Sequence, residues 1–200
     1  MTAAAGQRPA APRFTERRHA ESLARQWDPE HQLIGALMHL EATRVAPILD
    51  LVPDHAIHDP IARWAYEIIG ALVDAGHDPD PVAVLATGSR QPARQALNPE
   101  ATPSARQHHR LALYLADAYT STVSPSLALS YAREVLEAAY RRSFRAHGMA
   151  MVCLADAGAD HATLTQHLGA ASDELTDLSR RSRQSCARQQ PNREFTAEAN

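Results

Sequence analysis

Apolar residues recur through most of this chain at the three- and four-residue spacing of amphipathic α-helices. One strong stripe runs over 60–75 and stops at Gly76, a residue type that commonly ends helices. Because this stripe is long and strongly apolar, we expect its helix to form the centre of the core. Its members are Ile61, Trp64, Ala65, Ile68, Leu72 and Val73. Shorter patterns predict further helices at about 29–41, 46–52, 81–87 and 104–119.

Several predicted helices begin with an acidic or hydroxyl residue followed by proline. A side-chain oxygen at this position can accept a hydrogen bond from a free N–H of the first turn, and proline lacks only an N–H that the helix does not need there. The local sequence therefore indicates where four helices begin. These starts are Asp28-Pro29, Asp59-Pro60, Asp80-Pro81 and Ser124-Pro125.

The C-terminal third predicts two antiparallel helices. A long helix over about 125–157 stops at Gly158, and Asp160 caps a last helix over about 160–182. The last helix carries apolar residues at alternating spacings of four and three, which is the 3.5-residue repeat of a coiled-coil seam. These seam residues are Leu164, Leu168, Ala171, Leu175 and Leu178. We expect the hairpin to project and its seam to bind a partner, and packing onto its own domain is the alternative.

Composition favours an all-α protein, because the chain is 5% aromatic and rich in alanine and leucine. We expect a compact helical bundle over 28–123 and a projecting C-terminal αα-hairpin over 124–182. A disordered Ala/Pro/Arg-rich leader (1–27) and a disordered polar tail (183–200) would flank them. The sequence lacks a continuous apolar run of about 18 residues and a signal-peptide pattern, which predicts a cytoplasmic protein without membrane contact. The isolated Cys153 and Cys186 predict reduced thiols.

Charge is distributed unevenly along the chain. Residues 1–27 carry five Arg and two Glu, residues 28–178 carry ten Arg and nineteen acids, and residues 179–200 carry five Arg and two Glu. An acidic body repels phosphate, so the Arg-bearing tails could contact DNA only weakly and in a salt-sensitive way. All 20 residues of the Lys+Arg count are Arg, and without lysine the chain cannot form a G-x-x-x-x-G-K-[ST] phosphate loop.

Histidine supplies the main candidates for site chemistry, with 11 in the chain. The candidate groups are His55 with His58 and Asp59, His108 with His109, and His161 with His167. None has the i, i+4 pair with an intervening Glu that forms a helical zinc site, so we expect solvated or core-edge histidines and neither metal nor cofactor.

Two other residue sets have structural explanations. Glu134 and Glu137 precede several arginines on one helix, which favours ion pairs over acid–base chemistry. Four tyrosines at helical spacing favour core or interface packing over base stacking, and they are Tyr114, Tyr119, Tyr131 and Tyr140. We therefore expect no catalytic residues and no enzymatic activity.

Three sequence blocks, in order, resemble the N-terminal domain of DnaB-type replicative DNA helicases. The first is DPEHQLIGAL (28–37), and the third is Tyr-Ala-Arg-Glu-Val (131–135) after an S-P turn. The second comprises Ile57-His58-Asp59-Pro60, Trp64, Tyr66, Gly76 and Pro79-Asp80-Pro81-Val82-Ala83-Val84. Together the blocks cover about 28–178. In the family this domain forms dimers through its helical hairpin, builds the collar of the hexamer and docks primase.

The resemblance implies a non-catalytic, DNA-replication-associated scaffold without the helicase motor. Its expected partners are a second copy of itself, as a homodimer or higher oligomer, and a replicative helicase or primase. The alternative is an accessory DNA-binding protein that acts through its Arg-rich tails, and a metal-dependent enzyme is the reading least favoured by the residues.

Overall fold

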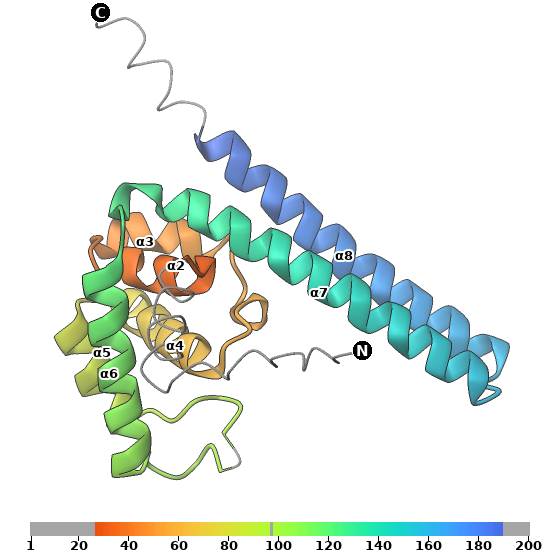
Figure 1. Cartoon of the computed structure of the whole chain (residues 1–200), viewed down its shortest axis with the longest axis horizontal. Coiled ribbons are helices and arrows are strands. Elements are labelled where there is room, and N and C mark those ends of the chain that lie inside the picture. Colours follow the sequence, from red (N-terminus) through yellow and green to blue (C-terminus); the bar gives the residue numbers. More distant parts are fainter. Residues whose placement is uncertain (1–26, 97, 190–200) are drawn as a thin grey trace, which may run out of the picture.

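The computed structural model describes residues 27–96 and 98–189, and all of their regular secondary structure is helical (Figure 1). The α-helices are α2 (Pro29–Leu37), α3 (Ala42–Leu49), α4 (Pro60–Asp74), α5 (Pro81–Gly88), α6 (Ala105–Ser121), α7 (Ala128–Asp156) and α8 (His161–Gln189). Two 3-10 turns accompany them, η1 (Asp54–Ala56) and η2 (Pro125–Leu127). The predicted all-α fold is confirmed. Apart from Trp27, the predicted leader lies outside the described residues.

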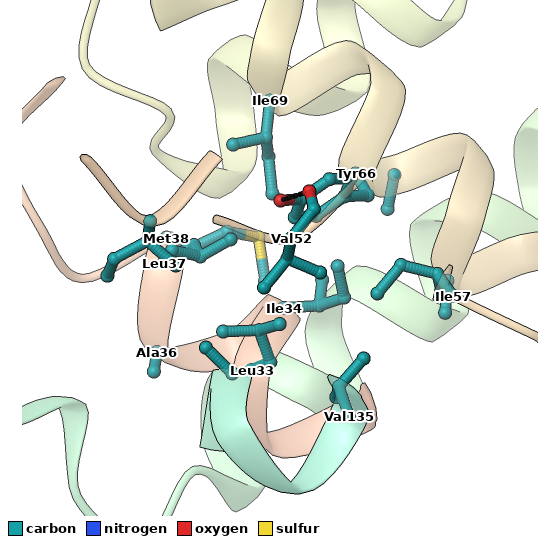
Figure 2. Close-up of a cluster of buried hydrophobic side chains, with 14 of the residues drawn as sticks. Leu33, Ile34, Ala36, Leu37, Met38, Val52, Ile57, Tyr66, Ile69 and Val135 are labelled. Atoms are coloured by element: carbon teal, nitrogen blue, oxygen red, sulfur yellow. Dashed lines mark hydrogen bonds between the residues drawn. The ribbon is translucent and has the colours of Figure 1, made fainter. Parts of the chain in front are cut away.

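Helix α2 lies at the centre of the bundle, between α4, α6 and α7. Leu33, Ile34 and Leu37 are fully buried, and Figure 2 shows them beside Val135 of α7 and Ile69 of α4. The sequence predicts α4 as the core helix, and α4 does bury its apolar stripe except for the half-buried ends. The sequence does not predict that α2 is buried on all sides, because its first turn is polar.

Three of the four predicted helix starts have the expected cap. Asp28, Asp59 and Asp80 each accept a hydrogen bond from a backbone N–H of the first turn of α2, α4 and α5. Ser124 differs, because its hydroxyl bonds the hydroxyl of Ser126 at 2.8 Å and the chain forms the turn η2 before α7 begins. The stop residues are confirmed as well, since Gly76 and Gly158 have positive φ angles of 77° and 70°.

Gly35 explains one residue of the first sequence block. A Cβ at this position would lie 2.3 Å from the carbonyl oxygen of Ala118 and 1.9 Å from the hydroxyl oxygen of Thr122. Glycine therefore lets the backbones of α2 and α6 approach closely, which brings α6 onto the core.

The hairpin of α7 and α8 extends beyond the bundle (Figure 1). The first half of α7 buries Ala132, Val135, Leu136 and Ala139, whereas the second half of α7 has no buried residue. Helix α8 continues to Gln189, so the predicted disordered tail is wrong for residues 183–189. Among the described helices, none combines the length and the apolar character needed to cross a membrane.

Candidate functional site: the projecting hairpin

The predicted seam of α8 is divided between the inside of the protein and its surface. Ala171 and Leu178 are buried, and Leu178 belongs to the main core. Leu164 and Leu175 are half-buried, whereas Leu168 is 57% exposed. The sequence left packing within the chain as the alternative to binding a partner. The structure shows this packing for Ala171 and Leu178. Leu168 remains available to a partner.

Polar side chains fix the register of α8 against α7. Ser182 donates a hydrogen bond to Glu137 at 2.6 Å, and Ser143 donates one to Glu174 at 2.6 Å. His147 Nε2 lies 2.9 Å from the same Glu174 carboxylate. The bonds from Ser143 and, second, from His147 hold the pKa of Glu174 below its usual range. Because these pairs are spread along the hairpin, sliding α8 by one turn would break all of them.

The outer part of α7 exposes large apolar side chains. Phe144, Met149 and Val152 are 62%, 67% and 60% exposed. Around Gly148 the surface has a shallow depression of about 510 Å³, lined by Tyr140, Arg141, Phe144, Arg145, Gly148 and Met149. We call this depression together with Val152 the α7 outer face. A Cβ at Gly148 would meet open space, so the packing of this chain does not require a glycine there.

A buried acid anchors the hairpin to the bundle, and sequence reasoning did not single it out. The carboxylate of Glu30 in α2 accepts hydrogen bonds from the backbone N–H groups of His58 and Asp59, at 2.9 Å each. Arg142 of α7 lies 3.2 Å from the same carboxylate and donates to the carbonyl oxygen of Ala56. This network joins α2, the loop before α4 and α7 where the hairpin leaves the bundle. Glu30 belongs to the first sequence block, but the local pattern of residues in that block does not indicate that Arg142 is its partner.

Arginines near the end of α8 are engaged within the protein. Arg181 donates to the carbonyl oxygen of Asp50 at 2.8 Å, and Arg188 donates to that of Pro47 at 2.7 Å. Both therefore contact the C-terminal turn of α3, where free carbonyl groups attract cations. Arg180 and Arg181 also pair with Asp177, and the bond from Arg181 is the main reason that the pKa of Asp177 is lowered.

The histidine candidates are dispersed. His55 and His58 are exposed on the loop before α4, His108 approaches the carbonyl oxygen of Leu85, and His161 bonds Thr165 in its own helix. The ring of His167 meets that of His147 edge-on at 5.3 Å between the hairpin helices. Over residues 27–96 and 98–189, no three potential ligand residues are grouped to hold a metal ion. Asp59 serves as the cap of α4.

The predicted ion pairs and tyrosine packing are partly as expected. Glu137 lies 4.0 Å from Arg141, the i, i+4 pair, whereas Glu134 pairs with its neighbour Arg133 at 3.0 Å. Tyr114 is buried and Tyr119 stacks on His39 at 3.9 Å. The other two tyrosines, Tyr131 and Tyr140, are half-buried.

No family model, no curated protein and no solved structure matches this chain. Arguments about function therefore depend on the fold, on the hairpin surface and on the resemblance noted in the sequence.

Proposed function

We propose that this protein is a non-catalytic scaffold of DNA replication that self-associates through its hairpin and docks to a replicative helicase or primase. The resemblance of the three sequence blocks to the helicase N-terminal domain motivates the choice of partners. The observation that carries the scaffold proposal is the exposed apolar surface of the hairpin, at Phe144, Met149 and Val152 of α7 and Leu168 of α8.

The position of these side chains supports a docking role. Phe144, Met149 and Val152 belong to the second half of α7, which has no buried residue, and the hairpin extends beyond the bundle (Figure 1). Phe144 and Met149 line one depression, and contiguous apolar surface on a monomer commonly marks a site of protein contact. Arg141 and Arg145 border the depression, and Arg is among the residue types enriched at interfaces.

The charges favour a protein partner over DNA. Residues 28–178 carry nineteen acids against ten arginines. Of the arginines in the Arg-rich C-terminal segment, Arg181 and Arg188 donate to carbonyl oxygens of α3 and Arg180 pairs with Asp177. A DNA complex would have to compete with these contacts, and it would weaken steeply with added salt.

Self-association is tested by light scattering of the wild type at tens of micromolar. We expect a dimer or larger particle, and we expect Phe144→Glu and Leu168→Arg each to reduce it, because each places a charge in a desolvated contact. Val82→Glu is the matched control, since Val82 is 76% exposed on α5, away from the hairpin. A wild type that stays monomeric, or a control as disruptive as the hairpin variants, would contradict self-association through this surface.

Partner choice is tested by titrating one protein sample against a replicative helicase, a primase and a short DNA duplex, at low and at physiological salt. We expect binding to helicase or primase to survive physiological salt and to weaken in Phe144→Glu. Tight DNA binding at physiological salt without any protein partner would instead support the accessory DNA-binding alternative.

A further inference from the structure

A cleft of about 820 Å³ lies on the bundle, separate from the hairpin surface. Its walls are the first turns of α4, the loop segments 92–96 and 98–103, and one face of α6. The volume lies in the range of ligand-binding clefts. Trp64 forms part of the wall, and its indole N–H donates to the carbonyl oxygen of Gln91 at 2.9 Å, which ties the start of the loop to α4.

The cleft combines apolar surface with acidic groups. Leu113 of α6 lines it and is 60% exposed, and Ile61 and Pro103 add further apolar atoms. Its acids are Asp28, Asp59 and Glu67, and its arginines are Arg63 and Arg110. Arg63 donates to the carbonyl oxygen of Ile57 at 2.7 Å. Glu67 is buried and accepts a hydrogen bond from the backbone N–H of Arg94 at 2.9 Å. Asp28 and Asp59 cap α2 and α4 but are not buried, so they are the acids that a ligand in the cleft can reach.

The leader (1–27) joins the described part of the chain at the edge of this cleft. Asp28 lines the cleft and follows directly on Trp27, the first described residue. Because consecutive Cα atoms are about 3.8 Å apart, Arg25 cannot lie more than about 11 Å from Asp28. The leader carries five Arg and two Glu, opposite in sign to the acidic body, and Phe14 and Leu23 are large apolar residues within it.

We propose that the leader occupies this cleft within its own chain, with Leu23 against the apolar wall at Leu113 and with leader arginines facing the acids. The covalent link makes a weak contact sufficient. A short tether gives an effective concentration in the millimolar range, so a contact with a dissociation constant of about 0.1 mM would be roughly 90% formed.

The test uses the full chain with a spin label on Ala20→Cys, in a background where the two exposed cysteines are removed by Cys153→Ser and Cys186→Ser. We expect amide NMR signals of the cleft lining to lose the most intensity, and signals of Met149 and Val152 on the hairpin to keep theirs. An even loss over the surface, or a loss centred away from the cleft, would overturn the proposal.

Two further arms separate the possible occupants. In the labelled chain, Leu113→Asp should restore the cleft signals, because it lowers the ratio of docked to free leader by roughly tenfold for each 1.4 kcal/mol of lost contact. Val82→Asp should leave the loss unchanged, because Val82 is also exposed (76%, against 60% for Leu113) but lies outside the cleft. Mixing spin-labelled chains with unlabelled, isotope-enriched chains should give no loss, and a loss in that mixture would assign the cleft to the leader of a second copy.

Discussion

The anchor between Glu30 and Arg142 gives the sharpest test of how the hairpin is held. The Glu30 side chain is 8% exposed, and its carboxylate receives two backbone N–H groups as well as the guanidinium of Arg142. Replacing Glu30 by Ala removes every acceptor at once. It leaves the N–H groups of His58 and Asp59 without this partner and leaves Arg142 without its counter-charge.

The magnitude follows from these contacts. An unsatisfied buried N–H costs about 1–3 kcal/mol, and breaking a buried ion pair by removing one partner costs about 3–5 kcal/mol. Because His58 and Asp59 are exposed residues and Arg142 is 31% exposed, all three groups can recover some hydration, and we expect Glu30→Ala to lower the free energy of unfolding by about 3–5 kcal/mol in total. Arg142→Met leaves the carboxylate with its two N–H donors, so we expect a smaller loss of about 1–3 kcal/mol.

Urea unfolding followed by tryptophan fluorescence measures both losses, and the double variant gives their coupling. Residues in one hydrogen-bonding network couple by about 0.5–3 kcal/mol, so the double variant should lose less than the sum of the two single losses. Glu134→Ala is the control, since this exposed acid pairs only with its neighbour Arg133 among the ion pairs found, and its loss should stay within about 0.5 kcal/mol. A loss below about 1 kcal/mol for Glu30→Ala, or additive losses, would refute the anchor.

Three further predictions concern single contacts. Gly35→Ala should lower the free energy of unfolding by about 1–3 kcal/mol or more, because the added Cβ would collide with α6. Gly70→Ala should raise it by up to about 1 kcal/mol, because a Cβ there meets open space. Thermal unfolding of the two variants compares these effects. Glu174 has a lowered pKa when folded, so its contribution to stability is present above its unfolded pKa and is lost as the pH falls through the lowered pKa. Glu174→Gln should therefore flatten the acid side of the stability–pH curve, and an unchanged slope would contradict this account. Tyr66→Phe should cost about 1 kcal/mol in urea unfolding, because the buried hydroxyl donates to the carbonyl oxygen of Val52 at 2.7 Å, and a neutral result would indicate that the bond contributes nothing.

Local signals in the sequence account for most of the helix boundaries. The caps at Asp28, Asp59 and Asp80 and the stops at Gly76 and Gly158 involve groups within a few residues of one another, so their patterns are readable in one dimension. The αα-hairpin was predictable for the same reason, since Gly158 separates two long periodic stretches.

Contacts between distant segments were not predictable in this way. Glu30 and Arg142 are far apart in sequence, and only the packing of α7 across α2 brings them together. The end of α8 was misplaced for a related reason. Its last turns are polar, but Ser185 is buried against α7 and donates to the carbonyl oxygen of Leu129, and Arg188 donates to α3. Local composition indicates a tail there, whereas the tertiary contacts support a helix.

The hairpin changes character along its length, and this change connects the fold to the proposed function. Near the bundle, α7 has α2 on one side and α8 on another, and its small residues Ala132 and Ala139 are buried. Beyond Arg142, α7 packs against α8 but has no buried residue. Two packed helices alone bury little apolar surface, and most helical stability in proteins comes from burying an amphipathic face. A second layer over Phe144, Met149 and Leu168 would give the outer half the burial that the bundle gives the inner half. Association would therefore bury the most additional apolar surface at the outer half of the hairpin, which is also the part that buries least within the monomer.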